Sequence, residues 1–154
     1  MPRPITIRAA GPAEAEVVWR LTVEAYRPER ERLHPPSRVF KETVPDVQRA
    51  MDEGTVYVAQ RGADVVGTVR VRLARDQDAL YCGRLAVLPA ARRWGIGTAL
   101  MERVERHACE ALRLMASRWE LFWGAPTGRR TPNDTYTRHA CILGHTCYAR
   151  VRAS

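Results

Sequence analysis

The chain has 154 residues, of which 45% are hydrophobic and 27% are charged, and its formal net charge is +8. A chain of this length buries a full core without disulfides or a metal, so we expect one domain over residues 1–154. Its apolar runs are far shorter than the ~20 residues that a membrane helix needs, and the N-terminal segment lacks an apolar signal core. These features predict a soluble cytoplasmic protein with no membrane partner, and the basic charge suits either a nucleic acid or a small polyanion.

The chain opens with a strand and a helix. Ile5, Ile7 and Ala9 alternate with polar residues, which is the period of a half-buried strand. A helix follows from about Pro12 to Tyr26, with proline favoured in its first turn. Its predicted inward stripe comprises Val17, Val18, Leu21 and Ala25.

The next segment, Arg27 to Thr43, mixes charges of both signs with three prolines. It is predicted to be a loop with at most a short helical turn, followed by a brief second helix from Pro45 to Met51. The side chains that this loop offers to a pocket are Glu31, His34, Arg38, Phe40 and Glu42.

Two β-rich runs, Thr55 to Gln60 and Val65 to Leu73, are joined by a short turn that contains Gly62, which predicts a hairpin. In the second run, apolar residues alternate with Arg70 and Arg72. We therefore expect one face of this strand in the core and the other in solvent.

A third strand and a long helix follow closely, between Leu80 and about Ser117. The strand reads as buried up to Val87, and Pro89 ends it because proline has no N–H for a sheet ladder. Gly83 within the strand suggests a bulge. The helix is expected to start close to Gly95, with an inward face made of Leu100, Val104, Ala108, Ala111 and Met115.

Between that strand and that helix lies the segment 92–98, Arg-Arg-Trp-Gly-Ile-Gly-Thr. Its glycines remove side chains that would keep a ligand from the backbone, and free N–H groups at a helix N-terminus hold phosphate oxygens. Arg92 and Arg93 add full positive charges. The segment predicts a pyrophosphate site; the alternative is an ordinary connection with helix-capping glycines, and no Gly-Lys-Ser/Thr follows that would indicate a nucleotide P-loop.

The remaining elements are a strand at Trp119 to Trp123, a glycine- and proline-containing loop, a last helix from about Asn133 to Ile142, and a closing strand around His145 to Val151. The order β-α-α-β-β-β-α-β-α-β predicts an α/β (α+β) fold with a mixed, mostly antiparallel central sheet flanked by helices. The exposed edge of the final strand would allow a homodimer.

The pattern Arg92-x-x-Gly95-x-Gly97, preceded by Arg84-Leu85-Ala86-Val87 and followed by an amphipathic helix, resembles the acyl-coenzyme A signature of the GNAT N-acetyltransferases. The element order is similar to theirs over nearly the whole chain. The resemblance implies direct transfer of an acetyl group from acetyl-CoA to a primary amine of a small molecule or peptide, in a ternary complex and without a metal. The cofactor-binding residues that it implies are Leu85, Ala86, Val87, Arg92, Arg93, Trp94, Gly95, Ile96, Gly97 and Thr98.

The resemblance also implies how the cofactor lies. A bulge in the central strand would open a slot for the pantetheine arm, which would bond to main-chain groups of Leu85 and Val87. The N–H near Val87 would polarise the thioester carbonyl. Trp94 could stack on the adenine or only shield the first helical turn, and the loop between the first two helices would line the acceptor pocket.

The proton donor to the leaving thiolate is commonly a tyrosine in this family, in the pattern Tyr-x-x-x-Gly-Phe/Tyr. Tyr136 fits this pattern with Ala140 and Cys141 at the last two positions. A second register places Leu143-Gly144-His145 on the family's Leu-Gly-Phe and leaves no acid. We prefer the first register, which keeps a hydroxyl facing the site and makes Tyr136 the candidate catalytic acid.

A general base is harder to assign, because no carboxylate occupies the central strand where many relatives place a glutamate. Glu24, Asp78 and Glu120 are the nearest candidates by element. Water, or an acceptor that arrives neutral, would serve instead. Because no general base is assigned, two alternative functions remain: an acyl-CoA-binding domain with little or no catalysis, and a basic nucleic-acid-binding module. The arginines are scattered along the chain, which does not favour the nucleic-acid-binding module.

The four cysteines include no C-x-x-C pair, so they predict free thiols. His139, Cys141, His145 and Cys147 form two His-x-Cys pairs that would suit zinc in an extended loop. A helix-to-strand junction spreads the four side chains over different faces, and we therefore predict no metal site.

Overall fold

The computed structural model describes residues 3–32, 34, 37–73, 79–113, 121–124 and 147–151. Its helical elements are η1 (Pro12–Glu14), α1 (Ala15–Tyr26), η2 (Arg27–Glu29), η3 (Arg38–Lys41), α2 (Val44–Glu53), η4 (Pro89–Ala91) and α3 (Ile96–Arg113). Its strands are β1 (Ile5–Ala9), β2 (Thr55–Arg61), β3 (Asp64–Leu73), β4 (Ala79–Val87), β5 (Leu121–Gly124) and β6 (Cys147–Val151). The strands form one sheet in the order β1-β2-β3-β4-β6-β5, and all described pairings are antiparallel.

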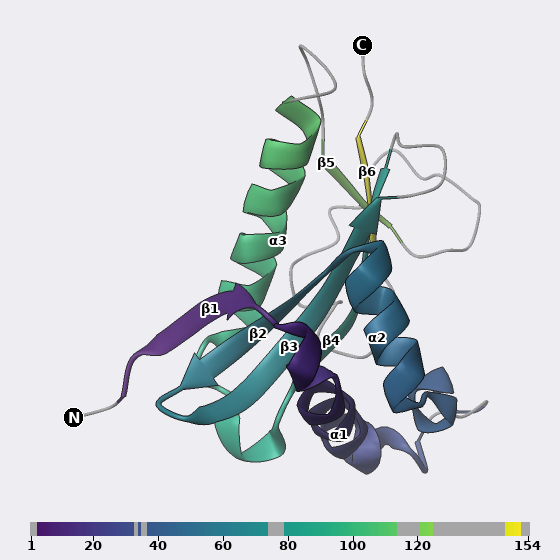
Figure 1. Ribbon diagram of the computed structural model, residues 1–154, viewed down its shortest axis with the longest axis vertical. Helices are drawn as coiled ribbons and strands as arrows, with labels where there is room; N and C mark the ends of the chain where they lie inside the picture. Colours follow the sequence, from purple (N-terminus) through teal and green to yellow (C-terminus); the bar gives the residue numbers. More distant parts are fainter. Residues whose placement is uncertain are drawn as a thin grey trace.

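Helices cover both faces of the sheet (Figure 1). On one face, Leu100 and Val104 of α3 pack against β-strand residues such as Val69, Val71 and Leu80, and all five are buried. On the other face, Ala15 and Val18 of α1 and Val47 of α2 are buried together with Val56 and Val58 of β2. The predicted α/β class, the flanking helices and the β2–β3 hairpin are confirmed.

α3 approaches the sheet closely at Gly67 of β3. A Cβ atom added there would lie 2.8 Å from Ile96 Cγ2 and 3.2 Å from Leu100 Cδ1, so a glycine lets the first turn of α3 lie close to the sheet. The end of β4 and the start of α3 are thereby fixed relative to one another.

The structure corrects four details of the sequence analysis. Val17 is 46% exposed, because it lies about 100° around α1 from Val18. The loop between α1 and α2 contains two helical turns, η2 and η3, rather than at most one; the side chain of Ser37 caps η3 by accepting from Val39 N. Arg70 of β3, expected in solvent, has a side chain only 11% exposed because it pairs with Glu42, whereas Arg72 on the same face is exposed as expected. The final strand, β6, lies between β4 and β5 and is not an edge.

The predicted irregularity in β4 is present, one residue beyond Gly83. Thr68 pairs with Ala86 and Arg70 pairs with Gly83, so Arg84 and Leu85 together lie opposite Val69. Arg84 has a positive φ of 54°. One extra residue in a strand is a β-bulge, and it reverses which face the following side chains take.

Near the N-terminus, an ion pair joins β1 to the start of the first helix. Arg8 donates from Nη1 and Nη2 to the Glu14 carboxylate at 2.8 and 2.7 Å, and Gly11 N donates to Glu14 Oε2 at 2.7 Å. The Arg8 hydrogen bonds, together with the Gly11 N–H, lower the pKa of Glu14 from 4.5 to about 2.

We predict that Glu14→Gln lowers the free energy of unfolding by about 1–2 kcal/mol at neutral pH, because the lost carboxylate accepts three hydrogen bonds. A carboxylate whose pKa is depressed on folding stabilises the protein above its unfolded pKa and loses this contribution as pH falls through the folded value. The difference between wild type and variant, measured by urea unfolding, should therefore shrink from about pH 5 towards pH 2. A difference that stays constant over this range would contradict the ion pair. Glu16→Gln, which removes the exposed partner of Arg20, is the control and should change stability much less.

Candidate functional site

A pocket of about 420 Å³ opens where the end of α1, the second half of β4 and the start of α3 meet. The residues that line it are Ala25, Tyr26, Glu29, Leu85, Ala86, Val87, Ala91, Arg92, Arg93, Gly95, Ile96, Gly97 and Thr98. Nine of the ten residues that the sequence predicted for cofactor binding lie here, and the tenth, Trp94, does not line the pocket. We call this the α3 pocket.

The backbone between β4 and α3 is shaped to present N–H groups. Arg93 and Gly95 both have positive φ, 71° and 72°. The first helical hydrogen bond runs from Ala99 N to Gly95 O at 2.9 Å, so the N–H groups of residues 96–98 have no acceptor within the helix. Cβ atoms added at Gly95 or Gly97 would meet no atom within 4 Å, so both positions face open space. Such N–H groups at the positive end of a helix dipole form an anion site.

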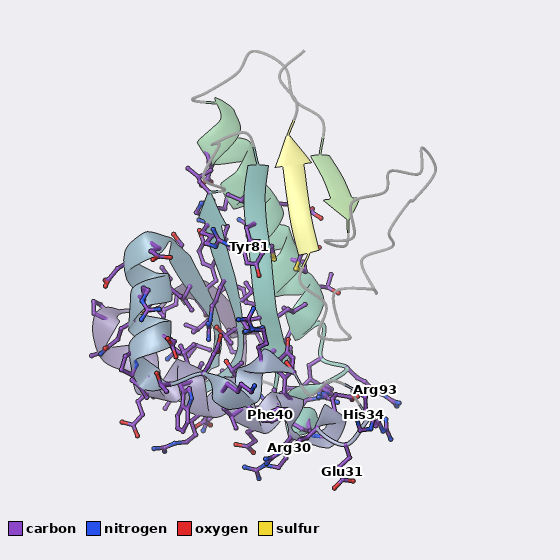
Figure 2. The ribbon with its side chains drawn as sticks, turned by 90° about the vertical axis from the view of Figure 1, so that its right-hand side faces the viewer. Arg30, Glu31, His34, Phe40, Tyr81 and Arg93 are labelled. Atoms are coloured by element: carbon purple, nitrogen blue, oxygen red, sulfur yellow. The ribbon has the colours of Figure 1, made fainter. Side chains whose placement is uncertain are left out.

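The side chains of Arg92, Arg93 and Trp94 in the same loop have different surroundings. Arg92 Nη2 donates to the carbonyl of Ala25 at 2.9 Å, which ties the loop to the end of α1. Arg93 is exposed and lies at the same end of the molecule as Arg30 and His34 of the loop after α1 (Figure 2). Trp94 is 47% exposed, and the Arg61 guanidinium stacks over it, with Arg61 Cζ 4.0 Å from the centroid of the Trp94 ring.

The end of β4 turns main-chain groups of Leu85 and Val87 away from β3. Leu88 N donates to Val66 O at 3.0 Å, so the main-chain groups of Leu88 and, two residues earlier, Ala86 face β3. Those of Val87 and Leu85, which alternate with them, face the other side. Among the described pairings, β6 pairs with β4 only from Ala79 to Cys82. Tyr26 donates its hydroxyl to Leu85 O at 3.2 Å. Burial raises the pKa of Tyr26, which keeps this hydroxyl protonated.

Several candidate residues take no described part in the α3 pocket. Cys82 is buried in the core, and burial raises its pKa to about 12, so it is not an activated nucleophile. Glu24 is exposed on α1 and lines neither this pocket nor the one described next. The candidates Tyr136, Asp78 and Glu120 lie outside the described residues, as do the histidines and Cys141 of the His-x-Cys pairs.

A second pocket, of about 570 Å³, lies on the α2 side of the sheet, between η3, α2 and the first half of β4. We call it the α2 pocket. Its lining includes Gly83 and Arg84, and the next residue, Leu85, lines the α3 pocket. Consecutive residues of the β4 bulge therefore line the two pockets.

Glu42 joins the walls of the α2 pocket. Its carboxylate accepts from Arg70 Nη1 and Nη2 at 3.1 and 3.0 Å and from Arg84 Nε at 2.8 Å. The three side chains are only 15%, 11% and 23% exposed. The backbone of Glu42 is held as well, since its carbonyl accepts from Trp19 Nε1 at 2.8 Å. The sequence analysis named Glu42 but missed this arrangement. Arg70 lies 28 positions and Arg84 lies 42 positions after Glu42 in the sequence.

Comparison with known proteins agrees with this geometry. The family model described as an acetyltransferase (GNAT) domain matches residues 52–139, more than half of the chain. The chain therefore belongs to the GNAT acetyltransferase family. A search of curated proteins gave no significant match.

Solved structures share the fold. A GNAT family acetyltransferase from Brucella melitensis, solved in complex with acetyl-CoA, is 22% identical, with a TM-score of 0.60, and the match covers 96% of this chain and 88% of that one. A GNAT acetyltransferase from Staphylococcus aureus is 13% identical, with a TM-score of 0.58 and coverage of 96% and 99%. For a proposed acetyltransferase from Pyrococcus horikoshii, 19% identical with a TM-score of 0.51, the match covers 69% of this chain and only 35% of that one.

We predict that Glu42→Gln lowers the free energy of unfolding by about 2–4 kcal/mol, because it leaves two largely buried guanidinium groups without their carboxylate. Urea unfolding at neutral pH measures the change. Adding Arg70→Met to Glu42→Gln should recover part of the loss, because one of the uncompensated charges is removed. A loss in the free energy of unfolding below about 0.5 kcal/mol would show that Glu42 is not needed to compensate the charges of Arg70 and Arg84.

Proposed function

We propose that this chain is an acetyl-CoA-dependent N-acetyltransferase that moves an acetyl group to a primary amine by direct attack in a ternary complex. The observation that supports this most directly is the α3 pocket, in which free N–H groups of a helix N-terminus lie beside the turned-out main chain of β4. The first feature suits a diphosphate and the second suits the extended pantetheine arm.

In this proposal the cofactor is held by the chain's own backbone. The N–H groups of residues 96–98 bind the diphosphate, and Arg93 adds charge at the mouth of the pocket. Arg92 keeps the loop against α1 through its bond to Ala25. The Val87 N–H, which faces away from β3, is the donor that polarises the thioester carbonyl.

The reaction is an acyl transfer. The neutral amine nitrogen attacks the thioester carbonyl carbon, a C–N bond forms and the C–S bond breaks. The amine loses a proton to water, and the departing thiolate gains one, for which we propose Tyr136 as donor. Cys82 is excluded as a covalent nucleophile by its burial and its raised pKa.

The acceptor is proposed to enter from the α2 pocket. Arg84 and Leu85 are neighbours in the β4 bulge and line different pockets. In this proposal the amine reaches the thioester past the bulge. This arrangement meets the demand of direct transfer that both substrates be bound together.

Gly97→Glu tests cofactor binding with little risk to the fold. Its Cβ meets open space and Gly97 lies in the first turn of α3, where a carboxylate is favourable to the helix but repels a diphosphate. We expect calorimetry to show at least about tenfold weaker acetyl-CoA binding, with thermal stability unchanged or raised. Gly95→Glu is a poorer choice because the φ of 72° at Gly95 strains any side chain.

Gly97→Ala is the matched control, since it adds a Cβ in the same open space without charge. It should weaken acetyl-CoA binding less than Gly97→Glu does, because a Cβ alone hinders approach to the backbone without adding charge. Equal binding by Gly97→Glu and wild type would place the diphosphate elsewhere. Acetyl-CoA binding without release of the thiol in the presence of any of a broad panel of amines would indicate a binding domain rather than an enzyme.

A further inference from the structure

We infer that the acceptor amine also carries an anionic group, a carboxylate or a phosphate, and that the α2 pocket binds this group. The inference rests on the proposed function and specifies its second substrate. It starts from the charges that line the pocket.

Six of the thirteen lining residues are basic and three are acidic. The basic residues are Arg38, Lys41, Arg49, Arg70, Arg72 and Arg84. They come from η3, α2, β3 and β4, which surround the pocket, so their charges converge on one hollow instead of lying along one exposed helix face. A concave site with one predominant sign of charge concentrates ligands of the opposite sign.

The acidic residues of the pocket do not cancel this charge. Glu42 is shared by Arg70 and Arg84. Asp46 caps α2 through Thr43 and lies 3.4 Å from Arg49. Glu53 is exposed at the end of α2.

Three cations of the pocket have no carboxylate partner among the described residues: Arg38, Lys41 and Arg72. Arg72 stacks its guanidinium 4.4 Å from the centroid of the Tyr81 ring, which leaves the N–H edge of the group for an acceptor. These donors suit carboxylate or phosphate oxygens.

The size of the pocket suits a small molecule. A volume of about 570 Å³ is typical of a metabolite site. The arginines line a hollow on one face of the sheet, whereas a nucleic acid needs a stripe of charge along the surface.

The same positive charge bears on the chemistry of the amine. Neighbouring cations disfavour the ammonium form, so they lower the pKa of an amine bound beside them. The neutral nucleophile is then populated without a carboxylate base on β4, where Tyr81, Cys82, Gly83 and Arg84 lie. The anionic group of the acceptor, bound by the arginines, would supply the free energy that holds the amine in the pocket against the repulsion by these cations.

The test uses pairs of primary amines that differ in the anionic group: phosphoethanolamine and ethanolamine, and β-alanine and β-alaninamide. With acetyl-CoA saturating, we expect kcat/KM to be at least about tenfold higher for the anionic member of at least one pair. The pair that responds distinguishes phosphate from carboxylate. Equal or better turnover of both neutral members would overturn the inference and leave the proposed function standing.

Two variants locate the effect. Arg38→Gln with Lys41→Gln removes two cations that have no carboxylate partner in the described structure, and should raise KM for the anionic amine about tenfold while KM for acetyl-CoA and for the neutral amine stay within about twofold. Arg106→Gln removes an exposed arginine of α3 outside both pockets and should leave all three values unchanged. An equal loss in both variants would mean that only the overall charge matters, which contradicts a site in the α2 pocket.

Binding measurements separate this inference from the proposed function. We expect calorimetric titration of the CoA-saturated protein to show tighter binding of an anionic amine than of its neutral partner, and Arg38→Gln with Lys41→Gln to abolish the difference. That result supports the inference even if no thiol is released, in which case only the proposed catalysis fails. Equal binding of both members of each pair contradicts the inference whatever the catalytic result.

Discussion

The extra residue in β4 is the constraint on which both pockets depend. Before the bulge, Leu80 and Cys82 face α3 and lie in the core; after it, Leu85 faces α3, so the alternation has shifted by one residue. Without this shift, Arg84 would point into the apolar layer under α3. The left-handed backbone at Arg84 costs about 1–2 kcal/mol, and its hydrogen bond to Glu42 offsets part of this cost.

Glu42 fixes the loop between α1 and α2 to the strand that carries the bulge. Trp19 of α1 holds its carbonyl, while Arg70 of β3 and Arg84 of β4 hold its carboxylate, so one residue connects a helix, a loop and two strands. Its carboxylate accepts three hydrogen bonds from these arginines. Glu42 therefore stabilises the walls of the α2 pocket, and both of its carboxylate oxygens are engaged by arginines.

Local patterns predicted most of the fold. Alternation located β2 and β3, and the apolar spacing of α3 matched its buried face, as Leu100, Val104 and Ala108 show. The glycines of segment 92–98 likewise indicated the α3 pocket. The Glu42 arrangement was not predictable in this way because its members are distant in sequence. A signal for the bulge did exist: the apolar positions change parity between Cys82 and Leu85, which a regular strand does not allow.

The distribution of charge also changes how the basic composition is understood. A net charge of +8 suits either a nucleic acid or a small polyanion, and seven of the arginines line the two pockets beside the β4 bulge. Under the proposed function one hollow faces the diphosphate of a cofactor and the other an anionic acceptor, so both substrates are polyanions or carry a negative group. The same field that draws them in disfavours the ammonium form of the acceptor. Binding and activation of the nucleophile then have a common electrostatic origin, and a carboxylate base on β4 would weaken both.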